Sequence, residues 1–114
     1  MEIISGKGRI RISNEVIMLI AKKTVEEVEG IVALNGGLPV GITEFFGKNA
    51  ASKKGVRVTN EETQVIINLS VVVKYGIIIP EVVKTVQEKV KKAIEAMTDI
   101  EVGQINVLVQ GIEV

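Results

Sequence analysis

The sequence contains neither cysteine nor histidine. Without cysteine the chain forms no disulfide, no thiolate nucleophile and no cysteine-bound metal site. Without histidine it lacks the side chain that serves most often as a general base and as a metal ligand. Any catalysis or metal binding would therefore have to rely on acids, lysines and hydroxyl groups alone.

Aromatic residues make up 3% of the chain, and its charges balance, with 14 lysines and arginines against 14 acidic residues. Dedicated nucleic-acid-binding proteins usually carry a basic excess, so this balance argues against nucleic acid as a partner. No apolar run reaches the roughly 18 residues that a membrane-spanning helix needs, and no basic region precedes an apolar run at the start. We expect a cytoplasmic protein without direct membrane insertion.

Hydrophobic residues make up 46% of the chain, which suffices for one core, so we predict a single domain over residues 1–114. Residues 64–110 alternate as a strand, then repeat as a helix after Pro80, then alternate again. The apolar positions of this segment are Val65, Ile67, Leu69, Val71, Val73 and Tyr75, then Val83, Val86, Val90, Ile94 and Met97, then Ile105, Val107 and Val109. Such a crossover predicts two parallel strands, with the helix over the odd-numbered face.

The first part of the chain predicts a second helix and further strands. Residues 8–12 alternate, with Ile10 and Ile12 directed inward, and Ser13 fits the N-cap of a helix that ends near Gly30. The apolar side of this helix is predicted to comprise Val16, Ile17, Ile20, Thr24, Val25 and Val28. Residues 31–34 are a possible strand, and residues 56–59 should form an antiparallel hairpin with the long strand.

These elements predict an α+β fold. It is a two-layer sandwich with a mixed β-sheet and two main helices on one face. The predicted β-α-β-β-α-β order suggests a ferredoxin-like arrangement, interrupted by an exposed basic loop at residues 47–55.

No motif for phosphate binding or catalysis is present. Gly47-Lys48 is followed by Asn49, where a phosphate loop needs serine or threonine. The pairs Glu26-Glu27 and Glu61-Glu62 are adjacent in sequence, which suits solvated surface better than two converging carboxylates. We therefore predict no catalytic, cofactor-binding or metal-binding residues.

Two groups of surface residues remain as candidates for an interaction surface. The basic group comprises Arg9, Arg11, Arg57 and Lys74 on the uncovered sheet face, with Lys48, Lys53 and Lys54 in the loop. The apolar group comprises Ile66, Val72 and Leu108 on the same face, with Ile112 and Val114 nearby. Because this face offers no aromatic side chain for stacking bases, solvation is the simpler interpretation of the basic group. Clustered apolar residues would instead mark a protein–protein patch.

A series of short motifs runs through nearly the whole chain, at residues 8–13, 15–17, 27–30, 36–37, 54–56, 71–76, 79–82 and 107–111. They read GRIRIS, EVI, EVEG, GG, KGV, VVVKYG, IPEV and VLVQG. In this order and spacing the chain resembles the bacterial alkaline-shock protein family, the general-stress and envelope-stress proteins of Gram-positive bacteria, in its short single-domain form.

The resemblance implies a non-enzymatic, cytoplasmic protein that supports cell-envelope homeostasis. Some such proteins self-associate, and some are held near the membrane by a separate membrane-anchor protein. Our leading hypothesis is a structural or scaffolding protein of the envelope and alkaline stress response that acts through protein–protein contacts. The alternative is a small nucleic-acid-binding module that uses the basic loop and the open sheet face. A small-molecule or lipid carrier is a third reading, for which the sequence supplies no polar constellation.

We also predict self-association through the last strand and the end of the chain. In this hypothesis Leu108 joins Ile66, Val72, Ile112 and Val114 in one apolar patch, which a second copy covers.

Overall fold

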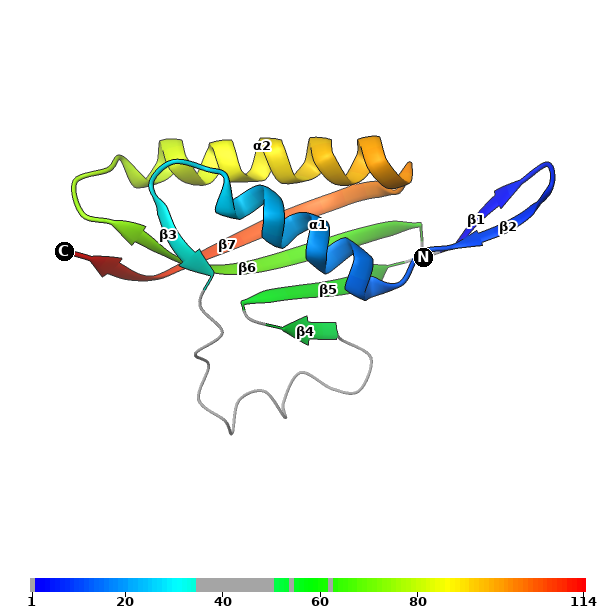
Figure 1. The fold of residues 1–114 in the computed structure, drawn as a ribbon, viewed down its shortest axis with the longest axis horizontal. Helices are drawn as coiled ribbons and strands as arrows, with labels where there is room; N and C mark the ends of the chain where they lie inside the picture. The colour runs from blue at the N-terminus through cyan, green and yellow to red at the C-terminus, as the bar shows by residue number, and fades with distance from the viewer. Residues whose placement is uncertain (1, 35–50, 54, 62) are drawn as a thin grey trace.

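The computed structural model describes residues 2–34, 51–53, 55–61 and 63–114, and of residues 51–53 it describes the backbone. Its elements follow one another in the order β1 (Glu2–Ser5), β2 (Gly8–Arg11), α1 (Asn14–Glu26), β3 (Ile31–Leu34), β4 (Ala51–Lys53), β5 (Val56–Glu61), β6 (Gln64–Lys74), α2 (Ile79–Thr98) and β7 (Glu101–Glu113). The fold is α+β, and the two helices pack on the larger of its two sheets (Figure 1).

Strand β6 is the centre of the larger sheet. β7 runs parallel to it along its whole length, and β5 and β3 pair with it antiparallel. β5 and β3 share one edge of β6, because Ser70 N–H donates to Gly55 and Lys74 N–H donates to Gly30, and these two amides point the same way. β4 extends the sheet beyond β5. The predicted parallel crossover and the predicted hairpin are both confirmed.

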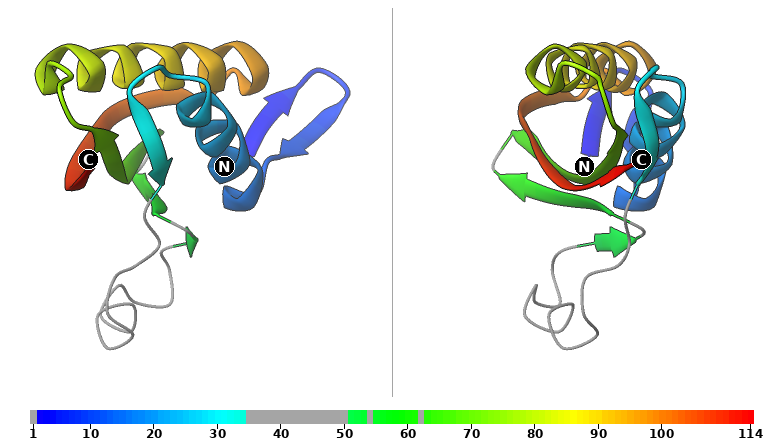
Figure 2. Two further views of the ribbon diagram at one scale, coloured as in Figure 1. Left: turned by 60° about the vertical axis from the view of Figure 1, so that its left-hand side comes forward. Right: turned by 90° about the vertical axis from the view of Figure 1, so that its left-hand side faces the viewer.

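The core lies between the helices and one face of this sheet, which we call the covered face; the opposite side is the open face (Figure 2). The odd-numbered residues of β6 from Val65 to Val73 are at most 1% exposed. Helix α2 places Val86, Val90 and Ile94 against them, and α1 adds Ile17 and Val25, all fully buried. Burying each such side chain stabilises the fold by roughly 1.5–3 kcal/mol.

Local signals fix the ends of the helices where the sequence predicts them. The Ser13 hydroxyl accepts from the Val16 amide (3.3 Å), so Ser13 is the N-cap of α1. Pro80 lies in the first turn of α2, where its missing N–H costs nothing. Gly30 follows α1 with a φ of +98°, a left-handed conformation that favours glycine.

Three predicted core positions on the two helices and the long strand are wrong. Val16 is 47% exposed, because α1 turns Met18 and Ala21 toward the core instead. Met97 is 72% exposed, and the next residue, Thr98, takes the buried place. The Thr98 hydroxyl donates to Ile94 O (2.6 Å) and accepts from the Ile100 amide (3.1 Å), which satisfies this buried polar group. Tyr75 follows the end of β6 and is 75% exposed.

The predicted strand at residues 8–12 does not join the larger sheet. β2 pairs with β1, and among the described residues it pairs with no other strand. Together they form a hairpin, here called the arm (residues 2–11), which projects from one end of the molecule (Figure 1). Ile12 packs against the core as predicted, whereas Ile10 is 49% exposed. A ferredoxin-like arrangement, which needs this strand in the main sheet, is therefore not confirmed.

Candidate interaction surface

The middle of the open face is polar. The register places Arg57 of β5, Asn68 of β6 and Asn106 of β7 in one row across the sheet. The Asn106 side-chain amide donates to the Asn68 side-chain oxygen (3.1 Å), which links the two strands on this face. The Gln64 amide donates in the same way to Glu101 (3.3 Å) at the start of both strands. These cross-strand pairs stabilise the sheet and offer no reactive group.

An apolar patch lies further along the open face, formed by Ala33, Val72 and Leu108. Leu108 stands opposite Ser70, two residues before Val72 on β6, and Ala33 stands opposite Val72 on β3. Leu108 is 56% exposed and Val72 is half-buried. On the other side of Val72 lies Gly111, where even a Cβ would touch the Val72 methyl groups at 3.8–3.9 Å. The glycine therefore leaves that flank of Val72 open.

Other residues predicted for this patch lie elsewhere. Ile66 is also on the open face, but the rows of Asn68 and Ser70 separate it from Val72. The pairing of β7 with β6 shifts in register between Val71 and Val72. Ile112 therefore pairs with Val73, and its side chain lies on the covered side of the sheet. There it is 51% exposed. Val114 follows the strand and is fully exposed. A single patch containing all five residues is thus not formed.

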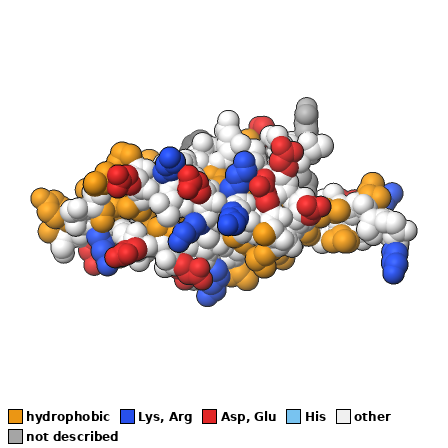
Figure 3. Space-filling model, turned by 90° about the horizontal axis from the view of Figure 1, so that it is seen from above, with side chains coloured by type: hydrophobic (Ala, Val, Ile, Leu, Met, Phe, Trp, Pro, Cys, Tyr) orange, Lys and Arg blue, Asp and Glu red, His pale blue; other side chains and the backbone are white. Residues whose placement is uncertain are grey.

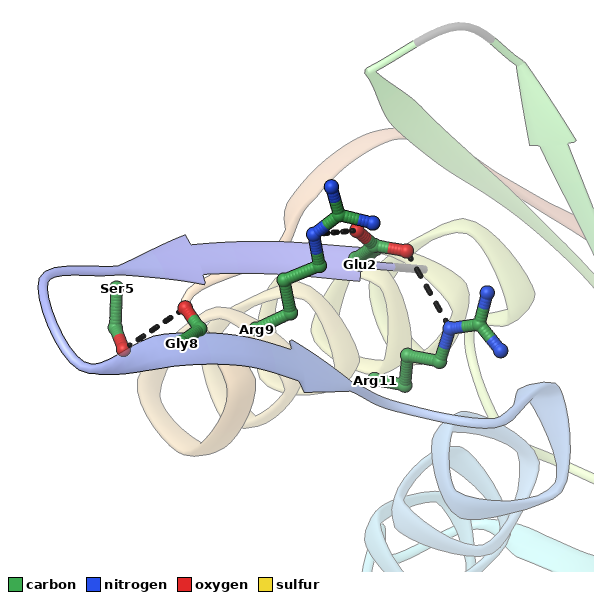
Figure 4. A network of polar contacts seen from close by, with 5 residues as sticks. All are labelled: Glu2, Ser5, Gly8, Arg9 and Arg11. Atoms are coloured by element: carbon green, nitrogen blue, oxygen red, sulfur yellow. Dashed lines mark hydrogen bonds and ion pairs between the residues drawn. The ribbon is translucent and has the colours of Figure 1, made fainter.

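The predicted basic group is also divided. Arg9 and Arg11 lie on the arm, where their Nε atoms are 3.6 Å and 3.4 Å from the two carboxylate oxygens of Glu2 (Figure 4). Arg57 is half-buried on the open face, and Lys74 lies exposed at its far end. The backbone of Lys53 belongs to β4, and Lys54 lies outside the described residues, as does most of the predicted basic loop. On the described part of the open face no basic stripe is formed.

Seen from the helical side, the surface mixes both signs of charge. Blue and red side chains alternate over α2 without a single-sign field, and orange side chains gather toward the two ends (Figure 3). This distribution agrees with the formal net charge of zero. It gives a nucleic acid no continuous basic track on that side.

Strand β7 presents a free edge that the sequence did not reveal. Within the described residues β6 is its single strand neighbour. The backbone amides of the even-numbered residues of β6 face β5 and β3, so those of its odd-numbered residues face β7. In a parallel pair, the partners of these odd-numbered residues direct their own N–H and C=O groups away from β6. These partners are Val102, Ile105, Val107 and Val109. Two side chains of α2 occupy the first half of this edge: Glu95 accepts from the Val102 amide (3.1 Å), and Gln87 donates to Ile105 O (2.9 Å). Alternation in the sequence predicts a strand but does not tell which strands end a sheet.

A groove of about 420 Å³ runs beside α1, where it is lined by Val16, Met18 and Leu19 with Glu15 and Lys22 at its rim. The described residues that line it include no pair of groups arranged as nucleophile and base. Nor does any cluster of three or more acidic side chains suited to a metal ion occur in the described parts of the chain.

Neither described helix is both long enough and apolar enough to cross a membrane. The fold and its surfaces thus define a small α+β protein that presents an apolar patch, a free strand edge and a projecting arm. Residues 2–114 match the model of the family of alkaline-shock protein 23, which is described as a family of cell envelope-related function. The chain belongs to this family.

Relatives of the chain occur in Gram-positive bacteria. YqhY of Bacillus subtilis is 34% identical over 93% of this chain and 78% of its own length. YloU of the same organism is 35% identical over 100% of this chain and 96% of its own length. The stress response regulator gls24 homolog of Streptococcus pyogenes is 26% identical over 94% of this chain and 60% of its own length. No solved structure matches the chain.

Proposed function

We propose that this chain is a non-enzymatic structural or scaffolding protein of the envelope stress response, acting in the cytoplasm through protein–protein contacts. We further propose that it self-associates and that a separate membrane-anchor protein holds it near the membrane. The family description and the name of the streptococcal relatives support a role in envelope-related stress.

The observation that carries the contact function is the apolar patch beside a free strand edge. Leu108 and Val72 lie on the same face of adjacent strands, and β7, which carries Leu108, has one edge that pairs with no other described strand. Apolar surface of this kind gains roughly 25 cal/mol per Å² when a partner covers it, before the costs of association. Natural sheets seldom leave a long edge uncovered unless something pairs with it or blocks it.

Sedimentation velocity over a range of concentrations tests this proposal. The wild type should form species larger than a monomer as its concentration rises, and Leu108→Lys should shift that transition to higher concentration. Leu19→Lys is the matched control, because Leu19 on α1 is 55% exposed against 56% for Leu108. A wild type that stays monomeric throughout, or a Leu108→Lys variant that associates as Leu19→Lys does, would contradict the proposed patch.

The anchor needs a separate test. We expect immobilised wild-type protein to retain a membrane protein from solubilised membranes of its native host. If the apolar patch binds only other copies of the chain, Leu108→Lys should retain that membrane protein equally well. Failure to enrich any membrane protein over an unrelated bait of equal size would argue against the anchor.

We do not propose a nucleic-acid function, because the basic residues that motivated it are divided between the arm and the sheet. A fluorescence anisotropy titration at physiological salt should show weak, salt-sensitive binding at most. Tight and sequence-selective binding would restore the alternative.

A further inference from the structure

The outer edge of β7, the edge that faces away from β6, changes in character along the strand. In its first half, side chains of α2 bond to the backbone of Val102 and Ile105. At Val107 and Val109, no described side chain or strand bonds to the outward N–H and C=O groups. The side chains of both valines pack against the core, which holds this backbone in an extended conformation. The stretch is thus a strand edge already shaped to pair with another strand.

Two copies of this edge can pair antiparallel, and the positions of their outward groups decide the alignment. An antiparallel pair forms its hydrogen bonds between outward residues that stand directly opposite each other. Only a two-fold axis at Leu108 sets Val107 of each copy opposite Val109 of the other. An axis at Val107 sets Val109 opposite Ile105, whose carbonyl already accepts from α2. An axis at Val109 sets Val107 opposite Gly111, beyond the shift in register that follows Val109.

The side chains and charges of β7 fit the same alignment. An axis at Leu108 sets the two Leu108 side chains, each 56% exposed, opposite each other on the open face. Residues 104–112 include no charged side chain and no proline, which are devices that commonly keep sheet edges apart. Glu113 lies opposite Gly103 of the second copy, so no like charges stand directly opposite each other.

We propose that two copies of the chain pair their β7 strands antiparallel over residues 107–109, about a two-fold axis at Leu108. Val107 of each copy exchanges both backbone hydrogen bonds with Val109 of the second copy, and the two larger sheets become one. The apolar patches of the two copies, each formed by Ala33, Val72 and Leu108, join across the axis. The inference rests on the proposed self-association and names the surface through which it occurs.

Disulfide formation by Leu108→Cys tests the alignment, since the native chain has no cysteine to give a background. Opposite residues of a non-hydrogen-bonded antiparallel pair have Cα atoms about 4.5 Å apart, which a disulfide can bridge. Asn106→Cys is the control, because it lies exposed on the same face of the same strand but away from its own copy. Under mild oxidation, Leu108→Cys should yield several-fold more linked dimer than Asn106→Cys. Equal yields overturn the alignment.

A proline on the edge tests whether the backbones pair or the patches merely pack face to face. Val109→Pro removes an N–H that points away from β6, so the hydrogen bonds within the chain are kept. Val109→Ala is the matched control, because it shortens the same side chain and keeps the N–H. In sedimentation velocity, Val109→Pro should need about tenfold higher concentration than Val109→Ala to associate.

The outcomes separate this inference from the proposal on which it rests. Equal association of Val109→Pro and Val109→Ala overturns strand pairing and leaves self-association through the apolar patch standing. A wild type that is monomeric at every concentration overturns both. If circular dichroism shows that Val109→Pro does not fold, the disulfide yields of the two cysteine variants decide.

Discussion

On β6, two adjacent isoleucines lie in opposite environments. Ile67 faces the helices and is fully buried, whereas Ile66 faces outward and is half-buried between Thr59 and Gln104. The same strand thus presents a covered face made of valine, isoleucine and leucine and an open face made of amides, hydroxyls and a few apolar side chains. The covered face determines the fold, whereas the open face and the edge of β7 lie outside the core.

The largest effect is expected on the covered side. Val90→Asp places an unpaired carboxylate at a fully buried position of α2, among side chains that cannot solvate it. Because small domains have only about 5–15 kcal/mol of stability in total, we expect this variant to unfold or aggregate. Circular dichroism and thermal melting check the result. A folded variant with an unchanged melting temperature would show that the covered face does not hold the fold together.

A paired substitution on β6 sharpens the comparison. Ile67→Ala should lower the free energy of unfolding by about 2–5 kcal/mol, because it opens a cavity in the core. Ile66→Ala, one residue away, should cost about 1 kcal/mol, the scale of strand propensity and partial burial. Urea denaturation of both variants measures the difference. Equal losses would mean that the two faces of β6 are buried alike.

A smaller effect is expected where backbone conformation rather than burial decides. Gly30→Ala should cost about 1–2 kcal/mol, because its left-handed φ strains an L-residue. A Cβ there would also approach Val82 Cγ2 to 3.2 Å. Gly6→Ala in the arm, where a Cβ meets nothing within 4 Å, is the control and should leave stability nearly unchanged. If Gly6→Ala were the more harmful of the two in urea, the arm would be part of the stabilising core.

Periodicity in the sequence was sufficient to predict the central unit of the fold. Alternation marked the covered residues of β6, a three-to-four residue spacing marked Val86, Val90 and Ile94, and Pro80 marked the corner between them. These signals are local consequences of burying one face of each element, so they do not depend on the rest of the topology. The N-cap at Ser13 was predictable for the same reason.

The partner of β2 and the register of β7 were not predictable in this way. Residues 8–11 alternate as a sheet strand does, but alternation does not identify the partner strand. That partner is β1, the nearest strand in sequence. The register shift beside Gln110 moves Ile112 to the covered phase, and no residue type announces it. Of the residues predicted for the surface, Val72 and Leu108 lie on the same face of adjacent strands, while Arg9, Arg11 and Ile112 lie elsewhere.

Hydrogen exchange at low and at high protein concentration is the most direct test of the claim that the chain covers one side itself and leaves the other for additional copies. Amides of β6, which has strands on both edges, should be protected equally at both concentrations. Peptides containing Val107 and Val109 should gain protection as concentration rises, because a second copy would cover the edge of β7 that no other described strand pairs with. Exchange of the β7 edge that does not change with concentration would contradict this account.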